Sequence, residues 1–254
     1  MYHYIEDKAF LGDMKCLCAG IINQLDQRIN NDSVMSVKAF LVGSGAKNLN
    51  TQNADEAIDL DYNLQIIDSA MRDGREIKAY IQKQFNVILN RNGWSDCQDS
   101  TSVLTTELRH FTRGNQTEFR IDLAIVKQDE NGWHRLIHEK TGFAALDRFY
   151  WNLAPSSRDL SERVSAIKQE NLWNEVREMY LDLKNMYLCR RDQNHPSFLV
   201  YIEAINQVYY RHFGNKIPQC IPCVPMAFGV DNLILGSYND SVDVRQRIGI
   251  QKGW

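Results

Sequence analysis

The sequence lacks the features that mark membrane and secreted proteins. No apolar run approaches the roughly 18 residues that suggest a membrane span. The first ten residues, MYHYIEDKAF, lack a basic segment followed by an apolar one, so we expect no signal peptide. The six cysteines follow no framework spacing, which is typical of reduced thiols. We therefore expect a cytoplasmic protein that does not associate with a membrane.

The sequence also has no strong excess of charge of either sign. Its 29 basic and 32 acidic residues leave a formal net charge of −3. This balance argues against bulk electrostatic capture of nucleic acid but is compatible with a local basic patch. With 254 residues, 44% of them hydrophobic, the chain can bury a sizeable core as one large domain or two closely associated ones.

The first part of the chain alternates between helical and strand patterns. Apolar residues at helical spacing predict helices over residues 7–30 and 69–90. Apolar or alternating runs between turn-forming residues predict strands. The predicted strands cover residues 37–42, 58–64, 102–110, 116–126 and 134–139. A Thr-Arg-Gly-Asn turn between the third and fourth of these strands predicts a hairpin.

The strand over residues 58–64 carries two aspartates, Asp59 and Asp61, on one face. Successive side chains of a strand point to opposite faces, so the apolar residues at its even-numbered positions line the other face. Two carboxylates this close repel and raise each other's pKa unless a cation lies between them. Mg²⁺ is a hard cation that one or two carboxylates hold together with substrate phosphates. An exposed edge strand would give the same pattern, so the pair alone is a weak signal.

A third aspartate, Asp122, lies in the apolar segment RIDLAIV, with its side chain on the face opposite to Ile121 and Leu123. A lone aspartate in such a strand costs stability unless it is solvated, paired or bound to a metal. The three carboxylates can converge if their two strands are neighbours in one sheet. The alternative is an unrelated α/β protein in which Asp122 lies far from the pair.

The later part of the chain has a different pattern. Beyond residue 142 we expect helices, with one over residues 159–190 that begins with a capping-box pattern and another that begins near Pro196. We expect the tail from Gly214 to be irregular but packed. We therefore divide the chain into an α/β domain over residues 1–158 and a helical domain over residues 159–254.

Basic side chains follow the polar edge of the predicted helix over residues 159–190. Such an edge is usually a solvated helix face. If this helix lines a substrate cleft, Lys168 or Lys184 would meet a triphosphate or another anionic substrate. No motif distinguishes between the two lysines.

The motifs occur in a recognisable order. Gly43-Ser44 after an apolar strand, then Asp59-x-Asp61, then Asp122 within an apolar strand resembles the nucleotidyltransferase superfamily typified by DNA polymerase β. The resemblance covers roughly residues 37–126 by motif and the helical part by general layout. It implies an α+β fold, with a nucleotidyltransferase domain built on a mixed sheet followed by a helical domain that completes the nucleotide and acceptor cleft.

The resemblance also implies a set of site residues. Asp59, Asp61 and Asp122 would hold two divalent metal ions, Mg²⁺ or Mn²⁺, and Asp122 would help to activate the acceptor. Gly43 and Ser44 would contact the β- and γ-phosphates of a nucleoside triphosphate, such as ATP, through backbone N–H groups and the hydroxyl. The implied reaction transfers a nucleoside monophosphate to a hydroxyl acceptor and releases pyrophosphate.

The acceptor and two lysine ligands stay open at this point. The gap over residues 45–58 is long and is similar to that of the cyclic-oligonucleotide and oligoadenylate synthetases. Within this gap, Lys47 is a candidate phosphate ligand. Lys184 of the helical part is a second candidate. The acceptor is a small hydroxyl compound, an RNA or protein side chain, or a second nucleotide. A catalytically idle relative that binds nucleotide or a partner and only regulates is the alternative function.

Overall fold

The computed structural model describes residues 1–154, 158–192 and 195–214, and the predicted tail beyond residue 214 lies outside these ranges. These residues form two compact units, and each is described by itself. One unit comprises residues 4–154, and the other comprises residues 1–3 together with the described residues from 158 onward. No helix in the described ranges is long and apolar enough to cross a bilayer.

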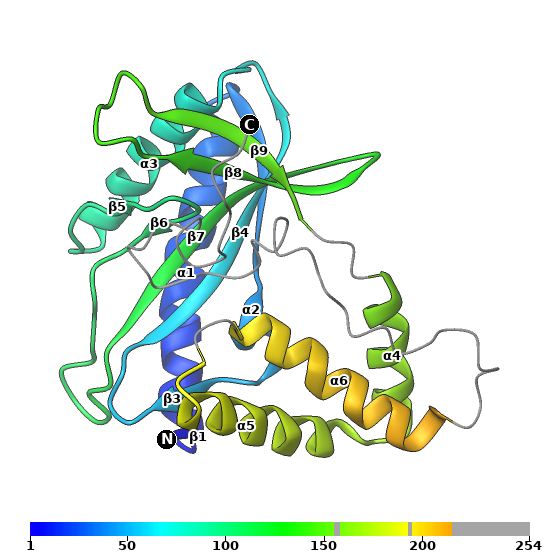
Figure 1. Ribbon diagram of the computed structural model, residues 1–254. Coiled ribbons are helices and arrows are strands. Elements are labelled where there is room, and N and C mark those ends of the chain that lie inside the picture. The colour runs from blue at the N-terminus through cyan, green and yellow to red at the C-terminus, as the bar shows by residue number, and fades with distance from the viewer. Residues whose placement is uncertain (155–157, 193–194, 215–254) are drawn as a thin grey trace. The chain divides into compact units, whose positions relative to one another are not determined.

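The larger unit is built on a seven-stranded mixed sheet. Its strands are β2 (Met35–Leu41), β4 (Ile58–Ser69), β5 (Gln98–Asp99), β6 (Leu104–Thr105), β7 (Phe119–Asp129), β8 (Gly132–Glu139) and β9 (Arg148–Leu153). They lie in the order β2-β4-β7-β6-β5, with β8 also paired to β7 and β9 paired to β8 (Figure 1). Only β4 and β7 run parallel among these described pairs. The predicted α+β class with a mixed sheet is confirmed.

Three helices and two short strands complete the elements of the N-terminal part. They are β1 (Tyr2–Tyr4), α1 (Lys8–Asn31), α2 (Gly43–Lys47), β3 (Thr51–Asn53) and α3 (Gly74–Arg91). The Asp7 side chain caps α1 by accepting a hydrogen bond of 2.9 Å from the Phe10 N–H. α1 lies against β2 and β4, α3 lies against β8 and β9, and the two helices pack on each other (Figure 1).

The core between the helices and the sheet decides which face of each strand stays polar. In β4 the apolar residues at positions 58, 60, 62 and 64 are buried, and the residues between them are partly exposed. The apolar stripe of α1 is buried against them, and each large side chain contributes about 1.5–3 kcal/mol when fully buried. The alternation predicted for this strand is confirmed, and the face that carries Asp59 and Asp61 is the one turned away from the core.

Three predicted elements were wrong. The strand over residues 102–110 is reduced to β6, because the Thr106 hydroxyl accepts the Ile121 N–H at 2.9 Å and the strand pairing resumes only at a bridge to Arg109. The region after residue 142 is not wholly helical, since the aromatic-rich segment RFYWNL forms β9. The helix over residues 159–190 is two helices separated at Asn171, which has a φ of +58°.

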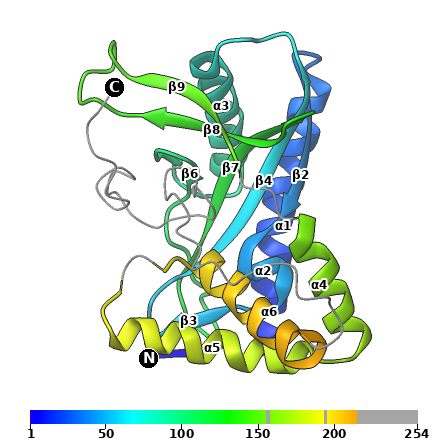
Figure 2. The ribbon, with the colours of Figure 1, turned by 45° about the vertical axis from the view of Figure 1, so that its right-hand side comes forward.

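The smaller unit consists of three helices, α4 (Arg158–Gln169), α5 (Trp173–Cys189) and α6 (Ser197–Phe213). α6 packs against both α4 and α5 (Figure 2). Its core is formed by Ile167, Val176, Tyr180, Leu183, Val200, Ala204, Ile205 and Val208. The N-terminal segment is tied to α5 by two bonds, because the Asn185 amide accepts the Tyr2 N–H at 2.7 Å and donates to the Tyr2 carbonyl at 3.0 Å.

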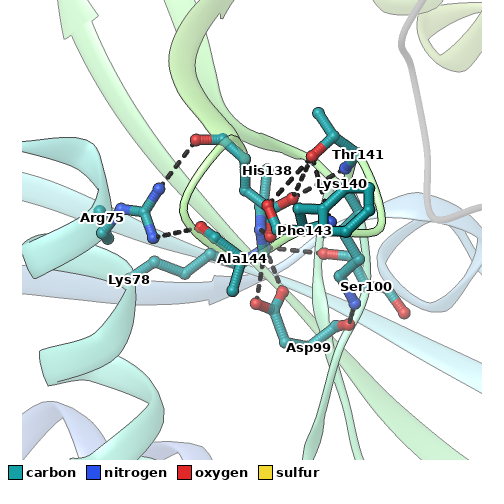
Figure 3. Close-up of polar contacts among 10 residues, drawn as sticks. Arg75, Lys78, Asp99, Ser100, His138, Lys140, Thr141, Phe143 and Ala144 are labelled. Carbon is teal, nitrogen blue, oxygen red and sulfur yellow. Dashed lines mark hydrogen bonds and ion pairs between the residues drawn. The ribbon is translucent and has the colours of Figure 1, made fainter.

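A polar network away from the strand aspartates anchors the loop between β8 and β9 (Figure 3). The two ring nitrogens of His138 lie 2.7 Å from Asp99 Oδ2 and 3.0 Å from Asp147 Oδ2. Lys78, a buried residue of α3, forms an ion pair of 2.5 Å with Asp99 and donates to the Ser100 carbonyl. These contacts join α3, β5, β8 and the loop, so this cluster has a structural role.

Candidate active site

The pairing of β4 with β7 brings the predicted carboxylates together. The strands are parallel neighbours, and their register sets Asp61 opposite Asp122 and Asp59 opposite Arg120. Neighbouring strands lie about 4.8 Å apart, and paired residues point to the same face of the sheet. Asp122 therefore stands beside the pair, and the alternative in which it lies far from them does not hold in this structure.

Burial dominates the electrostatics of these carboxyl groups. Asp122 is 1% exposed, and burial, reinforced by the charge of Asp59, raises its pKa to about 6. Burial also raises the pKa of Asp61 well above its usual range, and the charges of Asp122 and Asp59 add to this effect. The pKa of Asp59 is raised by burial and lowered by the neighbouring Arg120 guanidinium. The metal-free site thus disfavours its own negative charge.

Two of the three carboxylates have oxygens without hydrogen-bond partners. In the described part of the chain, Asp61 Oδ1 and both carboxylate oxygens of Asp122 are buried and accept no well-formed hydrogen bond. The side chain of Thr105, which is the register partner of Asp122 on β6, makes a weak hydrogen bond to Asp122 that lowers its pKa. Buried carboxylate oxygens without donors cost stability, and hard oxygen ligands are what Mg²⁺ and Mn²⁺ prefer. The Asp61–Asp122 pair therefore fits a divalent cation.

The third predicted ligand is arranged differently. Arg120 Nε donates to Asp59 Oδ1 at 2.7 Å, so this carboxylate has a cationic partner within the protein. Over the described ranges, no group of three or more His, Cys, Asp or Glu side chains is gathered to hold a metal ion. The structure thus sets Asp61 beside Asp122 and leaves Asp59 engaged with Arg120.

Gly43 fits against Asp61. It begins the five-residue helix α2 with a φ of +62°, and a Cβ atom at this position would lie 2.2 Å from Asp61 Oδ2. A glycine is needed both for the positive φ and for the close approach of the carboxylate. The Val42 N–H donates to the Asp61 carbonyl at 2.8 Å and fixes the turn to β4. Ser44 follows as the second residue of α2 and is partly exposed. The phosphate contacts of both residues stay predictions.

The two predicted lysine ligands lie in different units. Lys47 Nζ donates to the Gly43 carbonyl at 3.1 Å, and its charge lowers the pKa of Asp61. Lys184 belongs to α5, where its ammonium lies 3.8 Å from the Tyr2 ring centroid and 5.6 Å from that of Tyr180. Lys47 is therefore part of the electrostatic surroundings of the carboxylates, and the role of Lys184 stays a prediction.

Sequence reasoning missed two arginines. Arg120 precedes Asp122 by two residues, so the strand period places it on the same face, a signal that could have been used. Arg135 of β8 pairs with Val126 of β7, four residues after Asp122, and so shares that face too. The Arg135 charge lowers the pKa of Asp61 and of Asp122. No local sequence pattern indicates that Arg135 lies on the same face as Asp122, because its position depends on the pairing of β8 with β7.

No protein-family model and no curated protein matches this sequence. By structure, the chain is similar to CdnC of E. coli MS115-1 with ATP, with 14% identity and a TM-score of 0.50 over 93% of this chain and 76% of that one. It is also similar to the CdnC:HORMA-deltaN complex, with 16% identity and a TM-score of 0.49 over 83% and 61%. The 3′-deoxy GTP bound form of E. coli DncV has 9% identity and a TM-score of 0.46 over 67% and 45%.

At such low identity the likeness to CdnC concerns the fold alone. The chain shares the α+β fold of CdnC, and the predicted resemblance is confirmed at the level of the fold. The chain spans less than half the length of DncV.

Proposed function

We propose that the protein is a metal-dependent nucleotidyltransferase that moves a nucleoside monophosphate from a nucleoside triphosphate to a hydroxyl acceptor. The observation that carries this proposal is the pair formed by Asp61 and Asp122, two buried carboxylates on adjacent strands. In the described part of the chain, Asp61 Oδ1 has no hydrogen-bond partner and Asp122 has only the weak contact with Thr105. The fold shared with CdnC, which was solved with ATP, supports the same reaction class.

Each residue has a defined task in this proposal. Asp61 and Asp122 would hold Mg²⁺ or Mn²⁺, which, when bound, neutralises charge on the triphosphate and eases loss of the acceptor proton. The acceptor oxygen forms a bond to the α-phosphorus, and the bond from that phosphorus to the bridging oxygen breaks. Pyrophosphate leaves with the electron pair. Asp122 would receive the acceptor proton, and Gly43, Ser44 and Lys47 would hold the β- and γ-phosphates.

Three acceptor classes remain within the proposal, and product analysis separates them. A second nucleotide as acceptor predicts new nucleotide products from nucleoside triphosphates alone. A small hydroxyl compound, an RNA or a protein predicts that pyrophosphate appears only after that acceptor is added. Incubation with single triphosphates, pairs of them and all four, followed by ion-exchange chromatography, tests the first class directly.

The decisive test begins with binding. Thermal unfolding is measured with each of the four nucleoside triphosphates, with Mn²⁺ and with EDTA, for the wild type and for Asp61→Asn/Asp122→Asn. A ligand raises stability by RT ln(1 + [L]/Kd), so micromolar binding gives a clear shift at millimolar nucleotide. We expect a metal-dependent shift that the double variant loses. Asp68→Asn, an exposed change on the same strand β4, is the matched control and should keep the shift.

One observation favours the idle nucleotide-binding protein as a second candidate. Asp59 is paired with Arg120 rather than turned to a common metal position with the other two carboxylates. This candidate predicts nucleotide binding that does not depend on Asp61 or Asp122 and no pyrophosphate release with any acceptor.

A further inference from the structure

The ion pair between Arg120 and Asp59 lies at the centre of the proposed catalytic face. The two residues are direct register partners on β7 and β4, and Arg120 Nε lies 2.7 Å from Asp59 Oδ1. Their side chains are 24% and 17% exposed, so the pair is partly shielded from water. It lies two residues along the same two strands from Asp61 and Asp122, where Asp61 Oδ1 and both Asp122 oxygens have no such partner among the described residues.

The pair creates a competition for one carboxylate. An arginine stays protonated at all accessible pH values, so its charge cannot be removed by losing a proton. The guanidinium holds only Oδ1 of Asp59. A divalent cation that used Oδ1 as a ligand would have to displace the guanidinium, and a cation at Oδ2 would lie close enough to repel it. Metal entry at Asp59 therefore weakens the Arg120–Asp59 bond.

The displaced guanidinium would be able to bind a phosphate group. In the present contact Arg120 donates through Nε, and no other described residue is bonded to its Nη1 or Nη2 groups. A guanidinium fork matches phosphate oxygens in two-point contacts. Arg120 also shares its face of β7 with Asp122, so a triphosphate held by a cation at the aspartates would lie within reach of the freed side chain.

We propose that Arg120 is a resident counter-ion that leaves Asp59 when the cation binds and then contacts the triphosphate. This inference rests on the proposed function and adds a positioning residue to it. It accounts for the incomplete three-carboxylate cluster, because Asp59 becomes a metal ligand only in the loaded state. Cation and nucleotide binding are then coupled through one side chain.

The test separates the two roles of Arg120. Mn²⁺ binding without nucleotide is measured at pH 8 by the loss of the free-ion electron paramagnetic resonance signal. We expect Arg120→Gln to bind Mn²⁺ about 3- to 10-fold more tightly, since a partly exposed ion pair no longer competes. Binding of inorganic tripolyphosphate at saturating Mn²⁺, measured by calorimetry, should be weakened at least 5-fold. Arg120→Lys keeps the charge without the fork and should be intermediate in both.

Arg109→Gln is the matched control. Arg109 is also a partly exposed arginine with one carboxylate partner, Glu107 at 3.1 Å, but it is not a register partner of Asp59. Arg109→Gln should change neither the Mn²⁺ affinity nor the tripolyphosphate affinity. Unchanged or weaker Mn²⁺ binding in both Arg120 variants overturns the inference alone, provided that Asp61→Asn/Asp122→Asn abolishes Mn²⁺ binding. No Mn²⁺ binding by any of the proteins overturns both the inference and the proposed function.

Discussion

Asp122→Asn removes one negative charge from the middle of the sheet with almost no change in shape. The pKa of Asp122 is raised from 3.8 to about 6, chiefly because the side chain is buried. A carboxyl group with a raised pKa in the folded state costs stability whenever it is ionised. A difference of about two pKa units, at about 1.36 kcal/mol each, corresponds to a cost of up to about 3 kcal/mol at pH 8.

The sign of the pH dependence follows from the same shift. The folded protein binds the Asp122 proton more tightly than the unfolded chain, so stability from this group rises as pH falls from above 6 towards 4. Asp122→Asn should therefore be more stable than the wild type by about 1–3 kcal/mol at pH 8. The difference should shrink through pH 6 and disappear near pH 4, where the carboxyl group is neutral in both states.

The assay is urea unfolding in EDTA at several pH values between 4.5 and 8, with Asp68→Asn as an exposed control on β4. Each kcal/mol corresponds to roughly 2–4 °C in a thermal scan for a protein of this size. With millimolar Mn²⁺ the difference in stability between Asp122→Asn and the wild type should narrow or change sign, because only the wild type is stabilised by Mn²⁺ binding. If Asp122→Asn were no more stable than the wild type at pH 8 in EDTA, the argument from uncompensated burial would be refuted.

Further predictions concern the turn beside the site and the buried ion pair. Gly43→Ala should abolish Mn²⁺ binding, because the new Cβ atom would lie 2.2 Å from the Asp61 carboxylate. The control is Gly93→Ala, where φ is +74° and the space around the new Cβ atom is open. It should keep Mn²⁺ binding and lose only about 1–2 kcal/mol of folding stability to backbone strain. Asp99→Asn should destabilise the fold by about 2–4 kcal/mol, because the ammonium of buried Lys78 loses its carboxylate partner.

These predictions have simple refutations. If calorimetry found wild-type Mn²⁺ affinity in Gly43→Ala, Mn²⁺ binding would not depend on the close contact between Gly43 and the Asp61 carboxylate. For the buried pair, the control is Arg148→Gln, which removes the contact of 3.9 Å between this largely exposed arginine and Glu139 and should change stability by less than about 0.5 kcal/mol. Equal effects of Asp99→Asn and Arg148→Gln on the urea midpoint would contradict the role assigned to burial.

Local patterns predicted the elements that place the carboxylates. The strict alternation of apolar and polar residues over 58–64 determines which face of β4 is buried, so the facing of Asp59 and Asp61 follows from the amino-acid sequence alone. The same holds for Asp122 in β7. What periodicity cannot give is which strands become neighbours, and the opposition of Asp61 and Asp122 depends on the parallel pairing of β4 with β7.

The missed features depend on contacts between distant segments. The break between α4 and α5 rests on the left-handed conformation of Asn171, inside an otherwise regular helical pattern. β9 contains six residues that gain strand structure by pairing with β8. Arg135 reaches the face of β7 that carries Asp122 because β8 folds back on β7. For β9 and Arg135, tertiary pairing decides between conformations that the local sequence permits, whereas the break at Asn171 is a local backbone conformation.

The contrast between Asp59 and Asp122 argues for a bound cation more strongly than either residue alone. If the sheet required acidic residues only for solubility, both would be solvated or paired, as Asp59 is with Arg120. Asp122 is instead buried to 1% exposure, with only a weak contact to Thr105, at a position where we expect asparagine to leave the fold more stable. In the proposed function a cation bound on this face of the sheet would offset the cost, because it would supply a positive partner to both carboxylates. Without a cation, the charges of Lys47 and Arg135 lower the pKa of Asp61, and that of Arg135 lowers the pKa of Asp122, so they limit the repulsion within the pair.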